Sequence, residues 1–524
     1  MNVIKSFARN HKLFTSITTV AAASSLGLID KNNRKAVSES LYGIYRGISI
    51  YSSVFYILAD YKISFRGLTK GSKAYTDLEH TVNKRSGERL CKTFLKLGGV
   101  YIKTGQVLSS MELNLPPEWV EAMVPCQCDV TPIPFEEVSQ IFKEDIGIDS
   151  KDIFSSIDQT PIGCASLAQV HRATLKTGEE VAVKIQYPFL KKEAQIDIRN
   201  ADNLFRIIEL LFPNFELTWM IPWLKEQTRK EIDFHYEAEN GRYSREFFKN
   251  RDDIYVPKVY PELSSSRVLV MEYINGIKVN NINGIRFLGL NPQSVARSFV
   301  TAMGDMIFLA NRIHSDTHPG NVLIRQNPHN PSKHQVVLID HGQYCYIPRE
   351  FQYQFALLWQ AVILRDKSTV SAICQSLHLG SLEPFLPYML LEQSGLEDKQ
   401  IGEKISEDEW KEMETLMEGD YNMEAMLNDM KNMPREMMYM MKILPHITYI
   451  NNILGNSNRS RLYLLTDSSQ KGIDYNKNNH QNLSLYTKIQ STIHFLQLRF
   501  KLFYFDIVMH LLKSYLHSSL EKQK

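Results

Sequence analysis

The sequence predicts an α+β fold of two lobes, with a helical extension before the first lobe and another after the second. Three observations support this prediction. Residues 169–186 read as two strands joined by a tight turn at Gly178. Asn291 and Pro292 are typical of a helix start, and the helix they open is expected to run to about Arg312. A second strand pair is expected directly after it, at residues 322–325 and 336–339.

The composition indicates a globular chain with a large core. The chain has 524 residues, of which 44% are hydrophobic and 23% charged, so a small binding module, a disordered chain and a polytopic membrane protein are excluded. Sixty basic against 58 acidic residues give a formal charge of +2, which argues against nucleic-acid binding through overall charge. The six cysteines are too scattered for a disulfide framework or a zinc site, and we interpret them as buried or incidental thiols.

The first 60 residues are predicted to target the chain to mitochondria. No acidic residue precedes Asp30, and Lys, Arg, Ser and Thr are frequent before it. Residues 13–29 fit either a short membrane anchor or part of a cleaved presequence. Residues 41–58 are aromatic, but Arg46 within them favours an interfacial or core helix over a membrane span.

The chain divides by pattern into five regions. The C-terminal region contains an Asn-rich connector, 476–482, and an amphipathic helix or helix pair, 483–520, for which packing on the domain is favoured over membrane or partner contact. The Met-rich residues 410–441 are predicted to form a helix that belongs to the core. The predicted regions are 1–60 (targeting), 61–150 (helical extension), 151–271 (first lobe), 272–450 (second lobe) and 451–524 (C-terminal extension).

The hairpin of the first lobe carries a candidate phosphate-binding lysine. Val181, Val183 and Ile185 share one face of the second strand, so Lys184 points to the other. A loop of small residues, 163–168, enters the first strand about twenty residues before this lysine. Protein-kinase-like folds cover nucleotide phosphates with such a loop and grip them with a strand lysine. GxGxxG and GxxxxGK[ST] motifs are absent, and a structural lysine is the alternative.

The second lobe carries a candidate base and metal ligands. Asp316 and Asn321 stand five residues apart, as the HxDxxxxN loop of kinases requires for a base and a metal-binding amide. Asp340 ends the last strand before His341 and Gly342, where a carboxylate can hold Mg²⁺. Solvated loop acids are the alternative. A second metal site built on His314 and His318 is disfavoured, because such histidines more often orient the loop.

Residues 219–250 are predicted to form one charged helix that bears Glu231, Asp233 and Glu237. One of these acids is expected to pair with Lys184. Because a straight helix places Glu231 roughly 120° from Glu237, it cannot direct both at one lysine. We favour Glu237 for the ion pair, leaving Glu231 and Asp233 for a metal or another lysine.

These motifs together resemble the UbiB/AarF family of atypical kinases, and within it a mitochondrial subgroup, over about residues 72–441. The family's KxGQ motif corresponds to residues 103–106, its alanine-rich loop to 163–168, its strand lysine to Lys184 and its ExD motif to 231–233. The resemblance implies a protein-kinase-like fold that binds ATP or ADP with Mg²⁺, and it implies gating by the KxGQ region against the ExD acids. The implied site residues are, for catalysis, Asp316, Lys184 and Glu237; for the nucleotide, Gly163, Ala165, Ser166, Ala168, Lys184 and Glu272; for Mg²⁺, Asn321 and Asp340; and for gating, Lys103, Gln106, Glu231 and Asp233.

The resemblance also implies association with the mitochondrial inner membrane, its lipids or proteins, and a link to coenzyme Q or lipid homeostasis and membrane organisation. The loop has fewer alanines than the fullest form of this family. Two features depart from the usual kinase pattern: His341 replaces the Phe of DFG, and residues 344–350 lead into a helix without an activation segment. Because the lysine, base and metal-binding motifs are all present, an atypical kinase or ATPase is the first hypothesis. A non-catalytic nucleotide-dependent switch and a small-molecule phosphotransferase are the alternatives.

Overall fold

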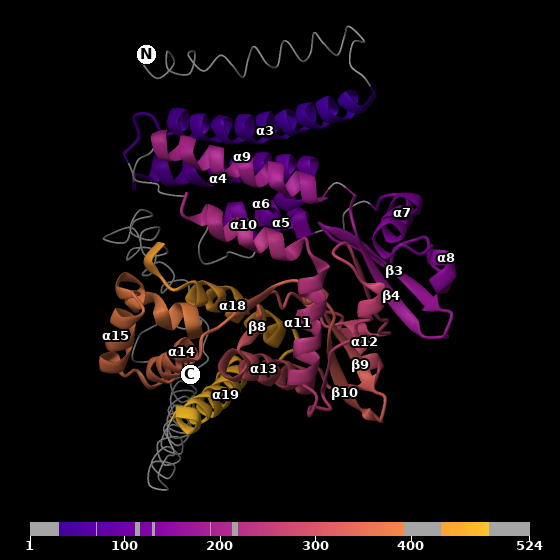
Figure 1. The fold of residues 1–524 in the computed structure, drawn as a ribbon. Coiled ribbons are helices and arrows are strands. Elements are labelled where there is room, and N and C mark those ends of the chain that lie inside the picture. Colours follow the sequence, from indigo (N-terminus) through magenta and orange to yellow (C-terminus); the bar gives the residue numbers. More distant parts are fainter. Residues whose placement is uncertain are drawn as a thin grey trace, which may run out of the picture. The chain divides into compact units, whose positions relative to one another are not determined.

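The computed structural model describes residues 31–69, 71–109, 116–127, 132–188, 190–211, 218–391 and 431–480. Contacts divide the chain into two units: Met1–Val130 with Phe189–Arg206, and Thr131–Pro188 with Ile207–Lys524. Figure 1 shows the elements of each unit, and the units are described separately. The division differs from the predicted regions, because residues 189–206 group with the N-terminal helices and 131–150 group with the first lobe.

The first unit is helical, and a buried arginine lies within it. Arg46, in the long first helix, has no exposed side-chain surface and donates two hydrogen bonds to Asp197, Nε to Oδ1 at 2.8 Å and Nη2 to Oδ2 at 2.5 Å. Its Nη1 donates to the carbonyl of Leu97 at 2.6 Å. Of the two forms predicted for residues 41–58, an interfacial or a core helix, the burial of Arg46 agrees with the core helix. The elements are α3 (Lys31–Ser64), α4 (Lys73–Leu97), α5 (Val100–Leu108), α6 (Pro117–Met123), η1 (Val124–Gln127) and the first part of α9 (Leu190–Leu211).

In the described part of the chain, no helix has the length and apolarity needed to cross a bilayer. Residues 13–29, where an anchor or presequence is predicted, lie outside the described residues, as do 483–520 and most of 410–441. The described residues between 433 and 441 support the core interpretation, because Met433, Met437 and Met440 are buried in the main hydrophobic cluster. Residues 476–480, predicted as part of an Asn-rich connector, are helical, because they continue the last described helix, which begins at Asn458.

The first lobe of the second unit is a five-stranded sheet in the order β1-β3-β4-β6, with β2 paired to β3. The predicted hairpin is confirmed within one residue. Val181, Val183 and Ile185 enter the apolar cluster beneath α7, whereas Ala182 belongs to a different cluster on the other face. The elements are α7 (Phe135–Ile146), α8 (Ser150–Ile153), β1 (Phe154–Ile157), β2 (Gly163–Cys164), β3 (Ala168–Leu175), β4 (Glu180–Gln186), α10 (Met220–Glu231), α11 (Phe234–Phe247) and β6 (Val268–Glu272).

The second lobe is mainly helical around the long helix α13 (Pro292–Leu309). Asn291 caps this helix, since its side chain accepts hydrogen bonds from the backbone N–H groups of Gln293 and Ser294. The helix ends before the predicted Arg312, which lies in a strand. The second strand pair is confirmed as β9 (Val322–Asn327) and β10 (Asn330–Leu338).

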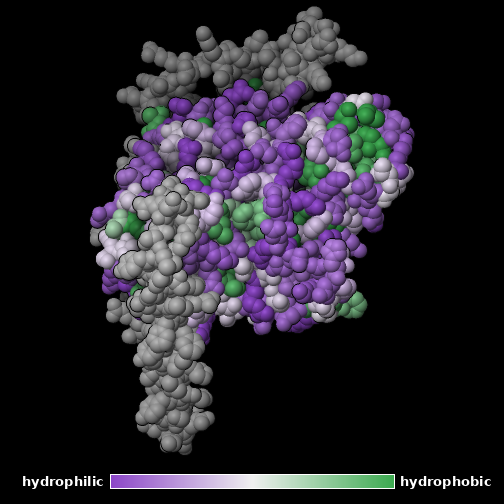
Figure 2. All heavy atoms as spheres, turned by 60° about the horizontal axis from the view of Figure 1, so that its bottom comes forward, coloured by the Kyte–Doolittle hydropathy of each residue, from purple (hydrophilic) through white to green (hydrophobic). Residues whose placement is uncertain are grey.

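The remaining elements of the second unit are β5 (Ile254–Tyr255), η2 (Pro261–Leu263), β7 (Ile277–Lys278), α12 (Ile282–Phe287), β8 (Arg312–His314), η3 (Pro319–Asn321), β11 (Tyr344–Tyr346), α14 (Arg349–Leu364), α15 (Lys367–Ser376), η4 (Gly380–Phe385), η5 (Pro387–Leu391), α18 (Arg435–Ile453) and α19 (Asn458–His480). Helices α13, α14, α18 and α19 bury the largest apolar cluster among the described residues. The face drawn in Figure 2 is mostly hydrophilic, as expected once such a core has formed.

Candidate active site

Lys184 joins three distant segments of the chain. From β4, its Nζ donates to both carboxylate oxygens of Glu237, at 2.8 and 2.9 Å, and to Oδ2 of Asp340 at 2.9 Å. Glu237 lies on α11 and Asp340 follows β10. The ion pair between Lys184 and Glu237 is therefore confirmed, and Asp340 shares the same amine.

The charges of this cluster depend on its burial. Burial opposes the charge of Lys184, but the carboxylates of Asp340 and Glu237 outweigh it, so the pKa of Lys184 is raised above its ordinary value. Burial raises the pKa of Glu237 to about 7 against the opposing effect of Lys184, and the Asp340 carboxylate adds to the rise. Lys184 is thus a fixed cation at neutral pH, and only about a tenth of its side chain is exposed.

The prediction of one straight helix over residues 219–250 is wrong, and the break explains how the acids separate. The chain leaves the helical conformation at Asp233, whose φ of −128° and ψ of 101° are extended, and α11 begins after it. The Asp233 carboxylate caps α11 by accepting from His235 N at 3.1 Å. Glu231, at the end of α10, accepts instead from the side-chain amide of Gln343.

Hydrogen bonds within the predicted catalytic loop position Asp316. Its backbone N–H donates to Nδ1 of the buried His314 at 3.2 Å, and its carbonyl accepts from the Asn321 side chain at 3.0 Å. His318 accepts from Gly320 N at 3.1 Å. Both histidines therefore orient the loop, in agreement with our preference. Over the residues that the structure describes, no group of three His, Cys, Asp or Glu gathers as a metal site.

Asn321 and Asp340 reach the same end of the β9–β10 hairpin. Val322 pairs with Leu338 in register, and Ile339 N donates to the Asn321 carbonyl at 3.1 Å. The Asp340 side chain is about one third exposed, and its Oδ1 accepts from Gly342 N at 2.9 Å. An amide oxygen with one carboxylate suits Mg²⁺, which keeps waters and phosphate oxygens as its other ligands. The residues present thus fit this ion.

His341, where kinases of the usual type have Phe, is a buried polar element. Its Nδ1 pairs with the Tyr344 hydroxyl at 2.8 Å and its Nε2 with the Leu338 carbonyl at 3.1 Å. Asn240 on α11 donates to its backbone carbonyl at 3.1 Å. Burial lowers the pKa of His341 to about 3, so the ring is neutral. The imidazole next to Asp340 is therefore itself held by hydrogen bonds, whereas a Phe ring would be held by apolar packing.

The other predicted nucleotide-binding residues border β3, β4 and β6. Ala165 N donates to the Ala168 carbonyl at 2.8 Å, which closes the small-residue loop as a turn. Ser166 and Ala168 are buried, whereas Gly163 is exposed and a Cβ added there would meet no atom within 4 Å. Glu272 ends β6, where its carboxylate accepts from the Tyr255 hydroxyl at 2.7 Å and from Lys258 N at 3.1 Å.

Two functional candidates were missed in the sequence: Lys442 on α18 and Gln343. Lys442 Nζ lies 3.7 Å from Oδ1 of Asp316 and donates to Gln343 Oε1 at 2.6 Å. A signal existed, because Lys442 is the only Lys, Arg, Asp or Glu between residues 437 and 450, a stretch in which most residues are apolar. Only the tertiary structure places that helix against the catalytic loop.

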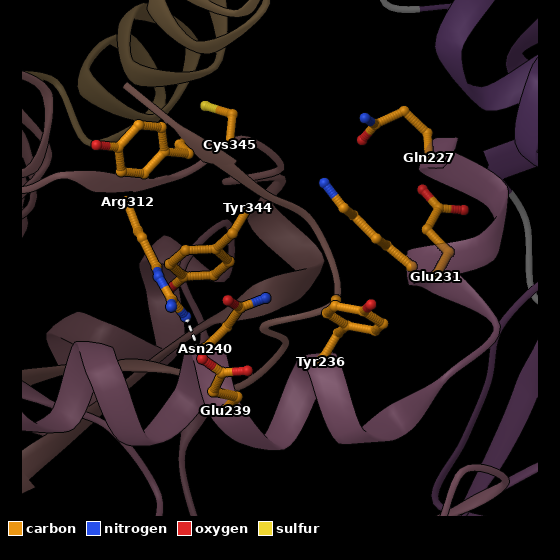
Figure 3. Close-up of a pocket in the computed structure, with 11 residues that line it drawn as sticks. Gln227, Glu231, Tyr236, Glu239, Asn240, Arg312, Tyr344 and Cys345 are labelled. Atoms are coloured by element: carbon orange, nitrogen blue, oxygen red, sulfur yellow. Dashed lines mark hydrogen bonds and ion pairs between the residues drawn. The ribbon is translucent and has the colours of Figure 1, made fainter. Parts of the chain in front are cut away.

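A polar cavity of about 220 Å³ adjoins this site. Figure 3 shows Glu231 and Gln227 of α10 on one side of it, and Tyr344 and Cys345 of β11 on the other. The salt bridge between Arg312 and Glu239, 2.8 Å long, lies at its edge. The cavity is lined by Gly342 and Glu231 but not by Lys184, Glu237, Asp316, Asn321 or Asp340, so it flanks the site rather than containing it.

The chain after Gly342 leaves no room for an activation segment. Residues 344–346 form β11, which pairs antiparallel with β8, and α14 begins at Arg349. The sequence prediction of a direct connection is confirmed, with the helix starting two residues earlier than expected.

The KxGQ residues lie in the first unit, on α5. Gln106 Nε2 donates to the Cys126 carbonyl at 3.1 Å. A Cβ at Gly105 would lie 2.4 Å from Cys126 Sγ, so this glycine permits the close packing of α5 on η1. Lys103 and Gln106 belong to one unit and Glu231 and Asp233 to the other, so their gating role stays a prediction.

Comparisons with known proteins identify proteins that this chain resembles. A family model described as the ABC1 atypical kinase-like domain matches residues 126–374. The probable serine/threonine-protein kinase abkD of Dictyostelium discoideum is 31% identical over 488 residues, covering 92% of this chain and 69% of that protein. AarF domain-containing protein kinase 1 is 33% identical in Gallus gallus, covering 72% of each chain, and 35% identical in Xenopus laevis, covering 64% of each. The structure of the Rv3197–erythromycin complex from Mycobacterium tuberculosis aligns with a TM-score of 0.45 at 21% identity, covering 76% of this chain and 98% of that one.

Proposed function

The chain belongs to the ABC1/AarF family of atypical kinases, whose fold is kinase-like, and we propose that it binds a Mg²⁺–adenine nucleotide and transfers or hydrolyses the terminal phosphoryl group. One observation carries this proposal: the Lys184 ammonium contacts both Glu237 and Asp340. Lysine, helix acid and metal acid occupy the same relation in active kinases.

In this proposal each residue has a separate task. Lys184, fixed by Glu237, binds the phosphates of ATP or ADP, and the loop from Gly163 to Ala168 covers them. Asn321 and Asp340 would hold Mg²⁺, which when bound would supply positive charge to the phosphates. Asp316 accepts the proton of the attacking hydroxyl or water. Phosphoryl transfer needs little more than such positioning and charge stabilisation.

Ligand-dependent thermal stability tests nucleotide binding. A ligand that binds only the folded chain raises the unfolding midpoint. We expect MgATP and MgADP to raise the midpoint of the wild type and not that of Lys184→Met, with Asp340→Asn losing the Mg²⁺-dependent part. Lys249→Met is the matched control, because its exposed ammonium makes only a surface pair with Glu246. No midpoint shift in the wild type would refute the proposal.

A non-catalytic switch is the second candidate, favoured by the direct passage from β11 to α14. Single-turnover hydrolysis by the wild type and by Asp316→Asn separates the two functions. An enzyme is indicated if the substitution slows hydrolysis. Equal nucleotide binding with no turnover in either protein would establish the switch.

We further propose that the chain acts at the mitochondrial inner membrane, with membrane lipids or proteins as partners, in coenzyme Q or lipid homeostasis and membrane organisation. The acid-free, basic first 29 residues support this location. A fluorescent fusion of residues 1–60 should reach mitochondria and resist carbonate extraction. Release by carbonate would leave targeting without an anchor, and a cytosolic fusion would contradict the location. Cells lacking the chain should show altered coenzyme Q or lipid content, which the wild type restores and Lys184→Met does not.

A further inference from the structure

Besides a metal ion, kinases use positively charged side chains to stabilise the group that moves, and the catalytic loop has no lysine or arginine for this task. Negative charge develops on the transferred phosphoryl oxygens, and positioned cations stabilise it. Residues 314–321 contain no lysine or arginine. His318, two residues after Asp316, is engaged within the loop by Gly320 N. Lys184 is held at the other acids, Glu237 and Asp340.

Helix α18 brings a lysine to this place from outside the loop. Lys442 Nζ lies 3.7 Å from the carboxylate of Asp316, the group that the proposed mechanism sets beside the attacking oxygen. A quarter of the Lys442 side chain and a fifth of the Asp316 side chain are exposed, so a ligand can reach both. His446, one turn further along α18, stays neutral because burial lowers its pKa to about 4. Lys442 is thus the charged group that α18 presents here.

A relay of hydrogen bonds holds Lys442 in this position. Gln343 accepts from Nζ through Oε1 at 2.6 Å, and its amide nitrogen donates to the carboxylate of Glu231. The backbone carbonyl of Gln343 accepts from Ser315 N at 3.0 Å, which ties the relay to the catalytic loop. Glu231 lies at the end of α10, beside the polar cavity of Figure 3. Glu231, the first acid of the ExD motif, is therefore connected to Asp316 through the side chains of Gln343 and Lys442.

From this geometry we propose that Lys442 is a catalytic residue that binds the terminal phosphoryl group of ATP, and that Gln343 and Glu231 are its positioning residues. In the transfer, the bond from the terminal phosphorus to the bridging oxygen of ADP breaks and a bond to the acceptor oxygen forms. The acceptor's proton passes to Asp316, and Lys442 stays protonated throughout. This inference rests on the proposed nucleotide site, and it predicts that the site binds ATP more tightly than ADP because only ATP has the group that Lys442 contacts.

The test compares the affinities of MgATP and MgADP, measured by calorimetry on the full chain. A lost charge-assisted hydrogen bond to the terminal phosphoryl group should weaken MgATP binding by about 10- to 100-fold in Lys442→Met. The affinity for MgADP, which lacks that group, should change by less than about twofold. Retained MgADP binding also shows that the variant is folded. Lys442→Arg should keep most of the ATP preference, and Lys249→Met should keep all of it.

The positioning residues give an independent readout. Gln343→Leu should lower the ratio of ATP to ADP affinity by less than Lys442→Met does, and it should add nothing in the Lys442→Met background because both act through one ammonium. If the wild type hydrolyses ATP, kcat should be about 100-fold lower in Lys442→Met.

The outcomes separate this inference from the proposed function. If the wild type binds neither nucleotide, the proposed function fails and the inference fails with it. If the wild type binds both, and Lys442→Met weakens both equally or neither, the nucleotide site stands and the role of Lys442 is refuted. A selective loss of MgATP affinity supports it.

Discussion

Replacement of Arg46 by Met tests whether the first unit depends on its buried ion pair. The guanidinium has no exposed surface, and the Asp197 carboxylate that it contacts twice is about 1% exposed. Removing one partner of such a pair leaves an uncompensated buried charge, at a cost of about 3–5 kcal/mol. Opening of the unit should therefore become roughly 100- to 4,000-fold more favourable. Native-state hydrogen exchange of α4 amides measures this opening without requiring the second unit to unfold.

The pH dependence of this variant follows from Asp197. Burial raises the pKa of Asp197 to about 6 even with Arg46 present, because desolvation outweighs the guanidinium. An acid with a raised folded-state pKa is stabilising at low pH, and this contribution is lost as the pH rises through that pKa. Without Arg46 the folded-state pKa of Asp197 is higher still. The free energy of unfolding of the variant should therefore continue to fall above pH 6, by up to about 1.4 kcal/mol per pH unit.

The double substitution Arg46→Met/Asp197→Leu is the matched control. It removes both charges, so it should recover most of the lost stability and abolish the additional slope above pH 6. Exchange rates are corrected for their intrinsic pH dependence. If Arg46→Met alone costs less than about 1 kcal/mol, or if the double variant is as unstable as the single one, the buried-pair reasoning is wrong.

Three further substitutions test packing, capping and charge. Gly105→Ala places a Cβ against Cys126 and should cost about 1–3 kcal/mol by overpacking, seen as faster exchange in α5; unchanged exchange would contradict the close approach. Asp233→Ala should destabilise the first turn of α11 by about 1 kcal/mol, whereas Asp233→Ser keeps a side chain that can cap the helix. If the amides of that turn exchange hydrogen equally fast in both variants, the capping role is refuted. Lys184→Met leaves Glu237 buried without its cation and should lower the free energy of unfolding in urea by about 3 kcal/mol. Adding Glu237→Gln to this variant should restore part of that loss. If the free-energy changes of the two substitutions simply add, the two side chains do not act as a pair.

The sequence was informative where a motif is local and less so where the site depends on tertiary contacts. The hairpin that carries Lys184, the loop from Asp316 to Asn321 and the strand end at Asp340 follow from turn residues, alternation and spacing, and the structure forms all three. The helix break at Asp233 was missed because its acidic neighbours read as one charged helix. An Asp followed by the aromatic Phe234, with Glu237 in the first turn, was nevertheless compatible with a new N-terminus.

Lys442 and Gln343 could not be assigned from the sequence for a different reason. Lys442 is separated from Asp316 by 126 residues, and its helix has no motif that indicates a catalytic role. Arg46 was an intermediate case. Its presence in an aromatic helix argued against a membrane span, but the partner, Asp197, lies 151 residues away and could not be identified.

Competition between Asp340 and the nucleotide for Lys184 leads to the sharpest test of the site. In the structure the amine already contacts two carboxylates, so a phosphate that binds it must compete with Asp340 Oδ2 at 2.9 Å. Removing the charge of Asp340 should therefore strengthen binding of metal-free ATP, because Lys184 gains capacity for phosphate, while it removes the ligand that Mg²⁺ needs. We expect Asp340→Asn to bind ATP more tightly than the wild type in the presence of EDTA and to gain less from added Mg²⁺.

Asn321→Leu is the matched comparison, because it removes a predicted metal ligand without touching Lys184. It should lower the gain from Mg²⁺ and leave metal-free binding unchanged. Without metal, Asp340→Asn should therefore strengthen ATP binding whereas Asn321→Leu should not change it, and a general loss of folding cannot produce the increase. If Asp340→Asn weakens ATP binding equally with and without Mg²⁺, then Asp340 does not compete for Lys184, and the close contact between them has another role.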